Sequence, residues 1–230
     1  MKTIGLIGGM SWESSSEYYR IINQTVKEKL GNSHSAKSLM LSVDFEEIKQ
    51  LMLEDDWDKL KNIMVNAAIQ LEKGGADFIV ICTNTMHRLV EDIAEKTNLP
   101  VLHIADATAQ KVKEKNIRKV GLLGTKFTME QDFYKKHLAE KHNLEVIVPD
   151  EEDRNTIHEV IFNELCFGQI NKSSKREYIR IIRNLKENGA KGVILGCTEI
   201  PLLIKQEDVS IPIFDTTRIH AEMAVEYALE

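Results

Sequence analysis

The sequence lacks a tract of clustered lysine and arginine, an apolar run of membrane-spanning length, and a linker rich in glycine, serine and proline. The net charge of −6 comes from interspersed acidic and basic side chains. This pattern argues against nucleic-acid binding and against membrane insertion. At 230 residues the chain is long enough for one large α/β domain or two small ones with a buried core.

Cysteine is also scarce. The three cysteines, Cys82, Cys166 and Cys197, are an odd number. The first apolar segment, residues 4–7, is broken at once by glycines, so it lacks the continuous apolar core of a signal peptide. We therefore expect free thiols in a reducing compartment and a cytoplasmic protein.

Several cofactor and catalytic motifs are missing. Gly5-x-x-Gly8-Gly9 is not the dinucleotide-binding fingerprint, and Asp44 lies too far downstream to be its usual acidic partner. There is no Gly-x-Ser-x-Gly elbow. The seven histidines are scattered, without metal-ligand spacing among the cysteines. We predict no metal site. His87 either orients a binding cleft or faces solvent.

One segment occurs twice. Residues 75–85 read GADFIVICTNT and residues 189–199 read GAKGVILGCTE, with a constant offset of 114 residues. Each copy begins with glycine after an amphipathic run, which indicates a helix end, and continues as a short run apolar on both faces. Such a run is typical of a buried parallel strand, and ligands bind beyond the carboxyl ends of such strands. The alignment places Thr83 opposite Cys197 at these ends.

The duplication extends further, because residues 120–124 (VGLLG) repeat residues 4–8 (IGLIG). Amphipathic periodicity, capping boxes and glycines predict alternating strands and helices. Strands are expected over 1–9, 38–43, 100–104, 120–124, 145–148 and 211–214, and in the apolar runs within 75–85 and 189–199. Helices are expected over 18–30, 57–73, 86–96, 107–115, 128–141, 155–167, 174–188 and 218–229, with capping boxes at 14–17, 128–131 and 174–177; residues 44–52 are expected to be a loop or short helix.

The fold class predicted from this order is α/β, with two pseudo-symmetric halves, each a mostly parallel sheet flanked by helices. The first half comprises residues 1–104 and the C-terminal helix, 218–230; the second comprises residues 105–217. Because no linker separates them, we expect the halves to press together around a shared cleft that holds the active site.

Cys197 is the best base or nucleophile in the chain. A free thiol has a pKa of about 8.5, which helix N-termini or nearby cations lower to roughly 3.5 to 7.5. Cys197 stands where a strand meets a turn, so backbone N–H groups are expected to favour its thiolate. Cys82 should point to the opposite face of its strand, and Cys166 should lie on the apolar side of a helix, so both are interpreted as structural.

Neutral hydrogen-bond donors collect at the predicted strand ends and suit a carboxylate. Ser11 and Thr128, taken singly, are better explained as helix caps. The convergence of several such donors on one sheet edge favours a role in binding a carboxylate instead. The donors are Ser11, Asn84, Thr85, Thr125, Thr198 and the backbone amides after Gly8 and Gly124.

These residues resemble the aspartate/glutamate racemase superfamily over the whole chain. The similarity rests on residues 8–11 (GGMS), 84–87 (NTMH), 123–125 (LGT) and, most specifically, 196–199 (GCTE). The start (MSWES) and residues 82–87 (CTNTMH) resemble the bacterial amino-acid racemases that act on aspartate and glutamate. The resemblance implies proton exchange at Cα without pyridoxal phosphate, metal or other cofactor. It also implies a homodimer and a substrate site that includes Met10, Ser11, Asn84, Thr85, Thr125, Thr198 and Glu199.

In that family two cysteines act from opposite sides of the substrate. By this resemblance, one of the two cysteines corresponds to Cys197 and the other to Thr83. The hydroxyl of a threonine is too weakly acidic to act as the base in the resting enzyme. We therefore expect asymmetric racemisation that favours L-enantiomers. Aspartate-specific relatives hold the side-chain carboxylate with a lysine and an arginine. Here Cys166 lies near the first position and residues 44–48 contain no arginine, which predicts looser substrate discrimination.

Two alternatives remain open at the level of sequence. Arylmalonate decarboxylases of the same superfamily also keep only the second cysteine, although residues 83–85 (TNT) argue against their apolar pocket. The second alternative is a non-catalytic protein that binds amino acids or dicarboxylates.

Overall fold

The computed structural model describes residues 1–230 and divides into two units. Unit 1 comprises Met1–Ile104 and His220–Glu230, and unit 2 comprises Ala105–Ile219. Each unit contains a four-stranded parallel sheet, with strand order β2-β1-β3-β4 in the first and β6-β5-β7-β8 in the second. The predicted α/β fold class is therefore confirmed, and the matching strand orders follow the sequence repeat.

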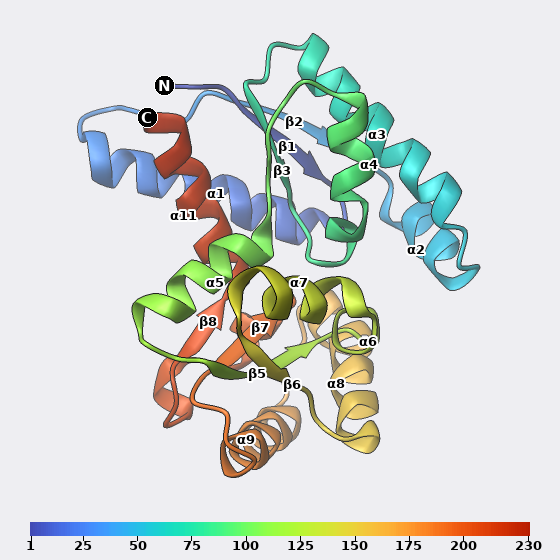
Figure 1. The fold of residues 1–230 in the computed structure, drawn as a ribbon, viewed down its shortest axis with the longest axis vertical. Helices are drawn as coiled ribbons and strands as arrows, with labels where there is room; N and C mark the ends of the chain where they lie inside the picture. Colours follow the sequence, from blue (N-terminus) through green and yellow to red (C-terminus); the bar gives the residue numbers. More distant parts are fainter. The chain divides into compact units, whose positions relative to one another are not determined.

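Unit 1 is built from alternating strands and helices (Figure 1). Its elements are β1 (Ile4–Gly8), α1 (Trp12–Leu30), β2 (Ser38–Ser42), α2 (Phe45–Leu53), α3 (Trp57–Lys73), β3 (Phe78–Ile81), the 3-10 helix η1 (Thr85–Leu89), α4 (Val90–Lys96) and β4 (Val101–Leu102). The C-terminal helix α11 (Thr216–Leu229) belongs to this unit from His220 onward.

Side-chain alternation along β1 and β3 decides which helices cover each face of the first sheet. Ile4, Leu6, Phe78 and Val80 point to one face, where they form a buried cluster with α1 and α11. Helices α3 and α4 pack on the strands from the other side (Figure 1). Both faces are covered, which explains why these strands are apolar throughout.

Unit 2 repeats this plan. Its elements are α5 (Ile104–Glu114), β5 (Lys119–Gly124), α6 (Lys126–Glu130), α7 (Asp132–His142), β6 (Glu145–Ile147), α8 (Glu151–Asn163), the 3-10 helix η2 (Leu165–Phe167), α9 (Lys172–Glu187), β7 (Val193–Gly196), α10 (Ile200–Leu203), the 3-10 helix η3 (Gln206–Asp208) and β8 (Ile213–Asp215). A core cluster joins β5 and β7 to α8, α9 and α10. None of the helices is long and apolar enough to cross a membrane.

Several predicted helix starts are wrong because a different residue caps the helix. Helix α1 begins at Trp12, where the Ser11 side chain accepts a hydrogen bond from the backbone of Ser14, so the predicted capping box at 14–17 is not the cap. Thr125, not Thr128, caps α6. Asp150 caps α8, which begins at Glu151, four residues before the predicted start. Residues 44–52 fall mostly in helix α2, capped by Asp44.

Other helix boundaries also differ from the prediction. Helix α9 begins at Lys172, two residues before the predicted capping box at 174–177. The expected helix 128–141 is interrupted at Gln131, whose backbone is extended, so α6 and α7 are separate helices. The helices predicted at 107–115 and 218–229 begin at Ile104 and Thr216.

Candidate active site

In unit 1, the predicted site residues lie where β1 and β3 end. Strand β1 leads through Gly9 and Met10 to Ser11, and the Met10–Ser11 peptide bond is cis. Strand β3 continues one ladder step beyond Ile81, since the Cys82 N–H donates to the Ile7 carbonyl at 2.9 Å. Thr83 follows and is partly exposed. The structure thus brings the Met10–Ser11 loop and Thr83 to neighbouring strand ends.

Two serines of α1 connect these strand ends. The Ser14 hydroxyl donates to the Cys82 carbonyl at 2.7 Å. The Ser15 hydroxyl accepts from the Gly9 N–H at 2.7 Å and donates to the Ser11 carbonyl at 2.9 Å. Every polar group in this set is paired inside unit 1, so the first turn of α1 fixes both loops. Neither serine was predicted to be part of the site.

Asn84 and Thr85 continue from Thr83 into η1. Both side chains are buried, at 3% and 8% exposure. Asn84 precedes η1 and makes no side-chain cap hydrogen bond to it, so its amide is not used as a helix cap. Its binding role stays a prediction.

Unit 2 places a second group at the ends of β5 and β7. Gly124 and Gly196 are paired across these strands. Thr125 follows the first glycine and Cys197 the second. In unit 1, the same register pairs Ile7 with Ile81 and brings Gly8 beside Cys82, after which Thr83 follows. Thr83 and Cys197 therefore occupy equivalent positions in the two sheets.

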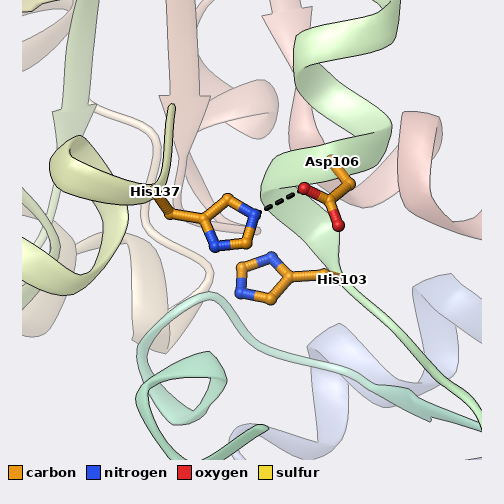
Figure 2. Close-up of side chains that lie close together, drawn as sticks. All are labelled: His103, Asp106 and His137. Carbon is orange, nitrogen blue, oxygen red and sulfur yellow. Dashed lines mark hydrogen bonds and ion pairs between the residues drawn. The ribbon is translucent and has the colours of Figure 1, made fainter. Parts of the chain in front are cut away.

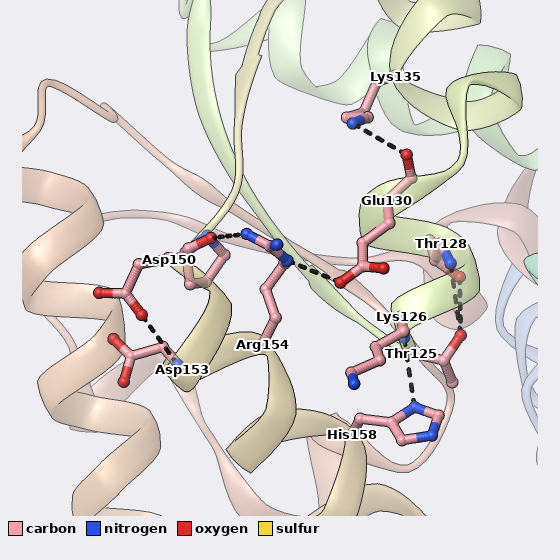
Figure 3. A network of polar contacts seen from close by, with 10 residues as sticks. Thr125, Lys126, Thr128, Glu130, Lys135, Asp150, Asp153, Arg154 and His158 are labelled. Atoms are coloured by element: carbon pink, nitrogen blue, oxygen red, sulfur yellow. Dashed lines mark hydrogen bonds and ion pairs between the residues drawn. The ribbon is translucent and has the colours of Figure 1, made fainter.

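Thr125 is held in a polar network of unit 2 (Figure 3). Its hydroxyl accepts from the Thr128 N–H at 3.4 Å. The Lys126 N–H donates to His158 Nδ1 at 3.3 Å, and Arg154 Nε donates to a Glu130 carboxylate oxygen at 2.9 Å. Since His158 and Arg154 lie on α8, this helix anchors the short helix α6 and its cap.

Glu199 controls the environment of Cys197. The Cys197 thiol donates to Glu199 Oε2 at 2.9 Å, and the Thr198 hydroxyl donates to the same oxygen at 2.7 Å. Burial and the adjacent carboxylate raise the pKa of Cys197 well above its usual value, although the Glu199 backbone N–H acts in the opposite direction. The predicted backbone stabilisation of the thiolate is thus present but outweighed, and this carboxylate contact was not predicted.

The other two thiols differ from Cys197. Cys82 is fully buried in the core of unit 1, and desolvation raises its pKa strongly. Cys166 lies in η2, on the same hydrophobic cluster as Cys197, and is partly exposed. The predicted structural role of Cys82 agrees with this burial.

Two histidines of α7 meet one carboxylate, a contact that the spacing of the histidines in the sequence did not predict. In unit 2, His137 Nε2 and His142 Nε2 lie 2.5 Å and 2.6 Å from the same Asp106 oxygen (Figure 2 shows Asp106 and His137). Lys113 Nζ is 3.3 Å from His142 Nδ1. Because an ionised carboxylate only accepts, both imidazoles donate through Nε2. One Asp106 oxygen therefore accepts hydrogen bonds from two imidazoles of α7.

Both sheets end in small polar side chains, and the Cys197 thiol of unit 2 corresponds to the Thr83 hydroxyl of unit 1. These features define a duplicated α/β protein of the racemase fold. The chain belongs to the Asp/Glu/Hydantoin racemase family, whose model matches residues 7–224.

Individual relatives agree with this assignment. The structure is similar to that of a proposed Asp/Glu racemase from Yersinia pestis, with 53% identity, a TM-score of 0.95 and full coverage of both chains. It is also similar to an aspartate racemase homologue from Pyrococcus horikoshii, with 41% identity, a TM-score of 0.89 and full coverage of both. A broad specificity amino-acid racemase of Bacillus subtilis is 26% identical over 164 residues, covering 70% of this chain and 69% of that one.

Proposed function

We propose that the protein is a cofactor-independent amino-acid racemase that exchanges the Cα proton of aspartate or glutamate, with Cys197 as the base. The observation that carries this proposal is the equivalence of Cys197 and Thr83 at matching strand ends in a chain of the Asp/Glu/Hydantoin racemase family. The thiol acts on one side of the substrate Cα and the threonine hydroxyl replaces the thiol expected on the other side.

The reaction begins with the thiol hydrogen bond to Glu199. Glu199 Oε2 accepts the Cys197 proton, and the thiolate then removes the Cα proton of the L-amino acid. The C–H bond breaks, its electron pair remains on the substrate, and an S–H bond forms. Return of the proton to the same face regenerates the L-form. Donation from the Thr83 hydroxyl on the other face gives the D-form, after which solvent returns a proton to the Thr83 oxygen and takes one from Glu199.

The surrounding polar groups suit an amino-acid carboxylate. Buried Asn84 and Thr85 in unit 1 and Thr125 in unit 2 are neutral donors, and Met10 and Ser11 contribute backbone at a strand end. Thr198 lies beside Glu199, to which its hydroxyl donates. With Cys166 near the position where a lysine is expected and no arginine in residues 44–48, side-chain selection should be loose. The broad specificity of the Bacillus subtilis relative supports this proposal.

The test is Cα deuterium incorporation, followed by NMR in heavy water across a panel of L- and D-amino acids. L-aspartate or L-glutamate should exchange faster than its D-form, because a hydroxyl is a much weaker base than a thiolate, and each 1.36 kcal/mol of barrier changes the rate about tenfold. Cys197→Ser should abolish exchange of the L-form, while Thr83→Cys should accelerate exchange of the D-form.

Cys82→Ala is the matched control, because it removes a thiol that packs in the core of unit 1 and leaves Cys197 and Thr83 in place. Equal exchange of both enantiomers by the wild-type protein would contradict the single-thiol mechanism. The family resemblance also leads us to propose a homodimer, which light scattering on the purified protein measures directly.

A further inference from the structure

His87 makes a hydrogen bond to the backbone of Thr83. Its Nδ1 lies 2.8 Å from the Thr83 carbonyl oxygen, four residues earlier in the chain. A carbonyl oxygen only accepts, so Nδ1 carries the proton. His87 is buried, with 3% exposure. The bond therefore spans the loop that carries the strand-end hydroxyl.

Two further histidines of unit 1 hold the His87 ring. The ring centroid of His87 lies 4.9 Å from that of His103 and 5.4 Å from that of His220. His220 Nε2 donates to the Leu102 carbonyl at 3.0 Å, so its Nδ1 accepts from the Tyr18 hydroxyl at 2.9 Å. This arrangement connects the loop after β3 to α1, α11 and β4.

The charge state of this cluster is fixed by burial. Desolvation, followed by the nearby His87, lowers the pKa of His220 to about 3, so His220 is neutral near neutral pH. A neutral His220 keeps Nδ1 available to accept from Tyr18 and leaves the ring beside His87 uncharged. His220 is therefore an uncharged neighbour of the His87 imidazole.

The bonded peptide group joins Thr83 to Asn84. In a trans peptide the carbonyl and the N–H point to opposite sides, so a hydrogen bond that fixes the Thr83 carbonyl also fixes the direction of the Asn84 N–H. These two residues are the proposed proton donor and a proposed substrate ligand. A rotation of this peptide would move both groups together.

We propose that His87 is a positioning residue that holds the Thr83–Asn84 peptide, and so the Thr83 hydroxyl, in the orientation needed to deliver a proton to the substrate. The proposal rests on the racemase function proposed above. His87 acts through the backbone of Thr83 and does not touch the substrate. Loss of its Nδ1 donor should therefore impair the half-reaction of Thr83 and spare that of Cys197.

Asparagine and glutamine variants separate the two nitrogens of the imidazole. In His87→Asn the amide nitrogen stands close to the former Nδ1 and can still donate to the Thr83 carbonyl. In His87→Gln the amide nitrogen stands nearer to the former Nε2, so the bond is lost at similar polarity. Tyr18→Phe is the matched control, because it perturbs the same buried cluster through His220 without removing the bond to Thr83.

The kinetic readout is the ratio of racemisation to Cα deuterium exchange of the L-substrate. His87→Gln should lower this ratio about tenfold or more, because small displacements of a reacting group cost that much in rate. His87→Asn should restore the ratio, and Tyr18→Phe should leave it unchanged. A purely structural role would lower racemisation and exchange together and would overturn the proposal.

A second readout does not depend on activity. Thr-Asn occurs only at Thr83–Asn84 and Thr97–Asn98. Carbonyl-13C threonine and 15N-asparagine labelling therefore gives two peptide signals, with Thr97 as an internal control. The Thr83 carbonyl signal should shift in His87→Gln, return toward its wild-type position in His87→Asn, and leave the Thr97 signal in place.

The outcomes distinguish this proposal from the proposed function. Wild-type protein without Cα exchange overturns the racemase function and with it the role of His87. Wild-type exchange combined with an unchanged ratio in His87→Gln, or with an unmoved Thr83 carbonyl signal, overturns the role of His87 alone.

Discussion

At the residue scale, the contact between Cys197 and Glu199 determines the reactivity of the thiol. The buried Glu199 carboxylate raises the pKa of Cys197 both by its charge and by accepting the thiol hydrogen bond. Replacing it with an amide removes the charge and keeps the shape. The thiol should then ionise at a lower pH, because its desolvation would no longer be reinforced by a neighbouring negative charge.

We therefore expect Glu199→Gln to move the pH midpoint of Cys197 alkylation to lower pH. The sign follows from the chemistry: only the thiolate reacts, so alkylation rises with pH through the pKa, and a lower pKa shifts the rise toward acid. Iodoacetamide labelling of the Cys197 peptide, measured by mass spectrometry between pH 6 and 10, gives the midpoint. Glu207→Gln, at an exposed glutamate of η3, is the control.

An unchanged midpoint would show that burial alone sets the pKa of the thiol. The racemisation rate of Glu199→Gln separates the effect of Glu199 on the thiol pKa from its role as proton acceptor. If Glu199 also accepts the thiol proton during turnover, the variant loses activity despite its more acidic thiol. Faster turnover together with a lower midpoint would contradict the role of Glu199 as proton acceptor.

At the element scale, the turn from β1 to α1 depends on the backbone of Gly9. Its φ is +93°, a conformation that L side chains rarely adopt. A Cβ at this position would lie 2.2 Å from the Val43 carbonyl oxygen and 2.6 Å from the Val43 N. The residue after β2 thus leaves no space for a side chain at the turn that leads to Ser11.

Gly9→Ala should consequently destabilise the protein by roughly 3 kcal/mol or more, since a strained φ and a backbone clash add together. Gly168→Ala is the matched control: Gly168 also has a positive φ, +68°, but a Cβ there meets nothing within 4 Å. It should cost only about 1 kcal/mol. Urea unfolding of the two variants measures the difference, and similar costs would mean that the turn relaxes away from Val43.

The strands were predictable because runs apolar on both faces are required in a covered parallel sheet, and the sequence repeat identified four of their ends. Helix starts were harder to predict. Ser14 and Ser11 both satisfy the sequence pattern of a cap, and only the turn at Gly9 decides that Ser11 is used. Asp150 likewise caps α8 ahead of the predicted start, in a stretch where several acidic residues are equally suitable.

The candidate site was predictable in part for a similar reason. The residues that directly follow a strand can be identified from the local sequence. Thr83 and Cys197 could therefore be aligned from the repeat. The hydrogen bond from Tyr18 to His220 joins residues 202 positions apart, and the bond from His87 to Thr83 depends on a side-chain rotamer. No local pattern carries that information, although the i, i+4 spacing of Thr83 and His87 permits the contact.

At the scale of the whole molecule, each unit has its own core and the C-terminal helix completes the first one. Ala221, Ala224, Val225 and Ala228 of α11 are buried in the cluster formed by α1, β1 and β3. The end of the chain therefore stabilises the sheet formed by its beginning. The Lys2 N–H, which donates to the Ala228 carbonyl at 2.8 Å, joins the two ends within unit 1.

This arrangement predicts that Ala224→Glu destabilises unit 1 selectively. Burying an unpaired carboxylate in an apolar cluster should cost roughly 3 kcal/mol or more. Amide hydrogen exchange followed by mass spectrometry should show faster exchange in β1 and β3, while β5 and β7 stay protected, because Ala224 is packed in the cluster of unit 1 alone. Ala139→Glu, on the exposed side of α7, is the control and should leave both sheets protected. Equal loss of protection in β1, β3, β5 and β7 would mean that the two units unfold as one cooperative body, in which case the duplicated sheets do not behave as separate units of stability.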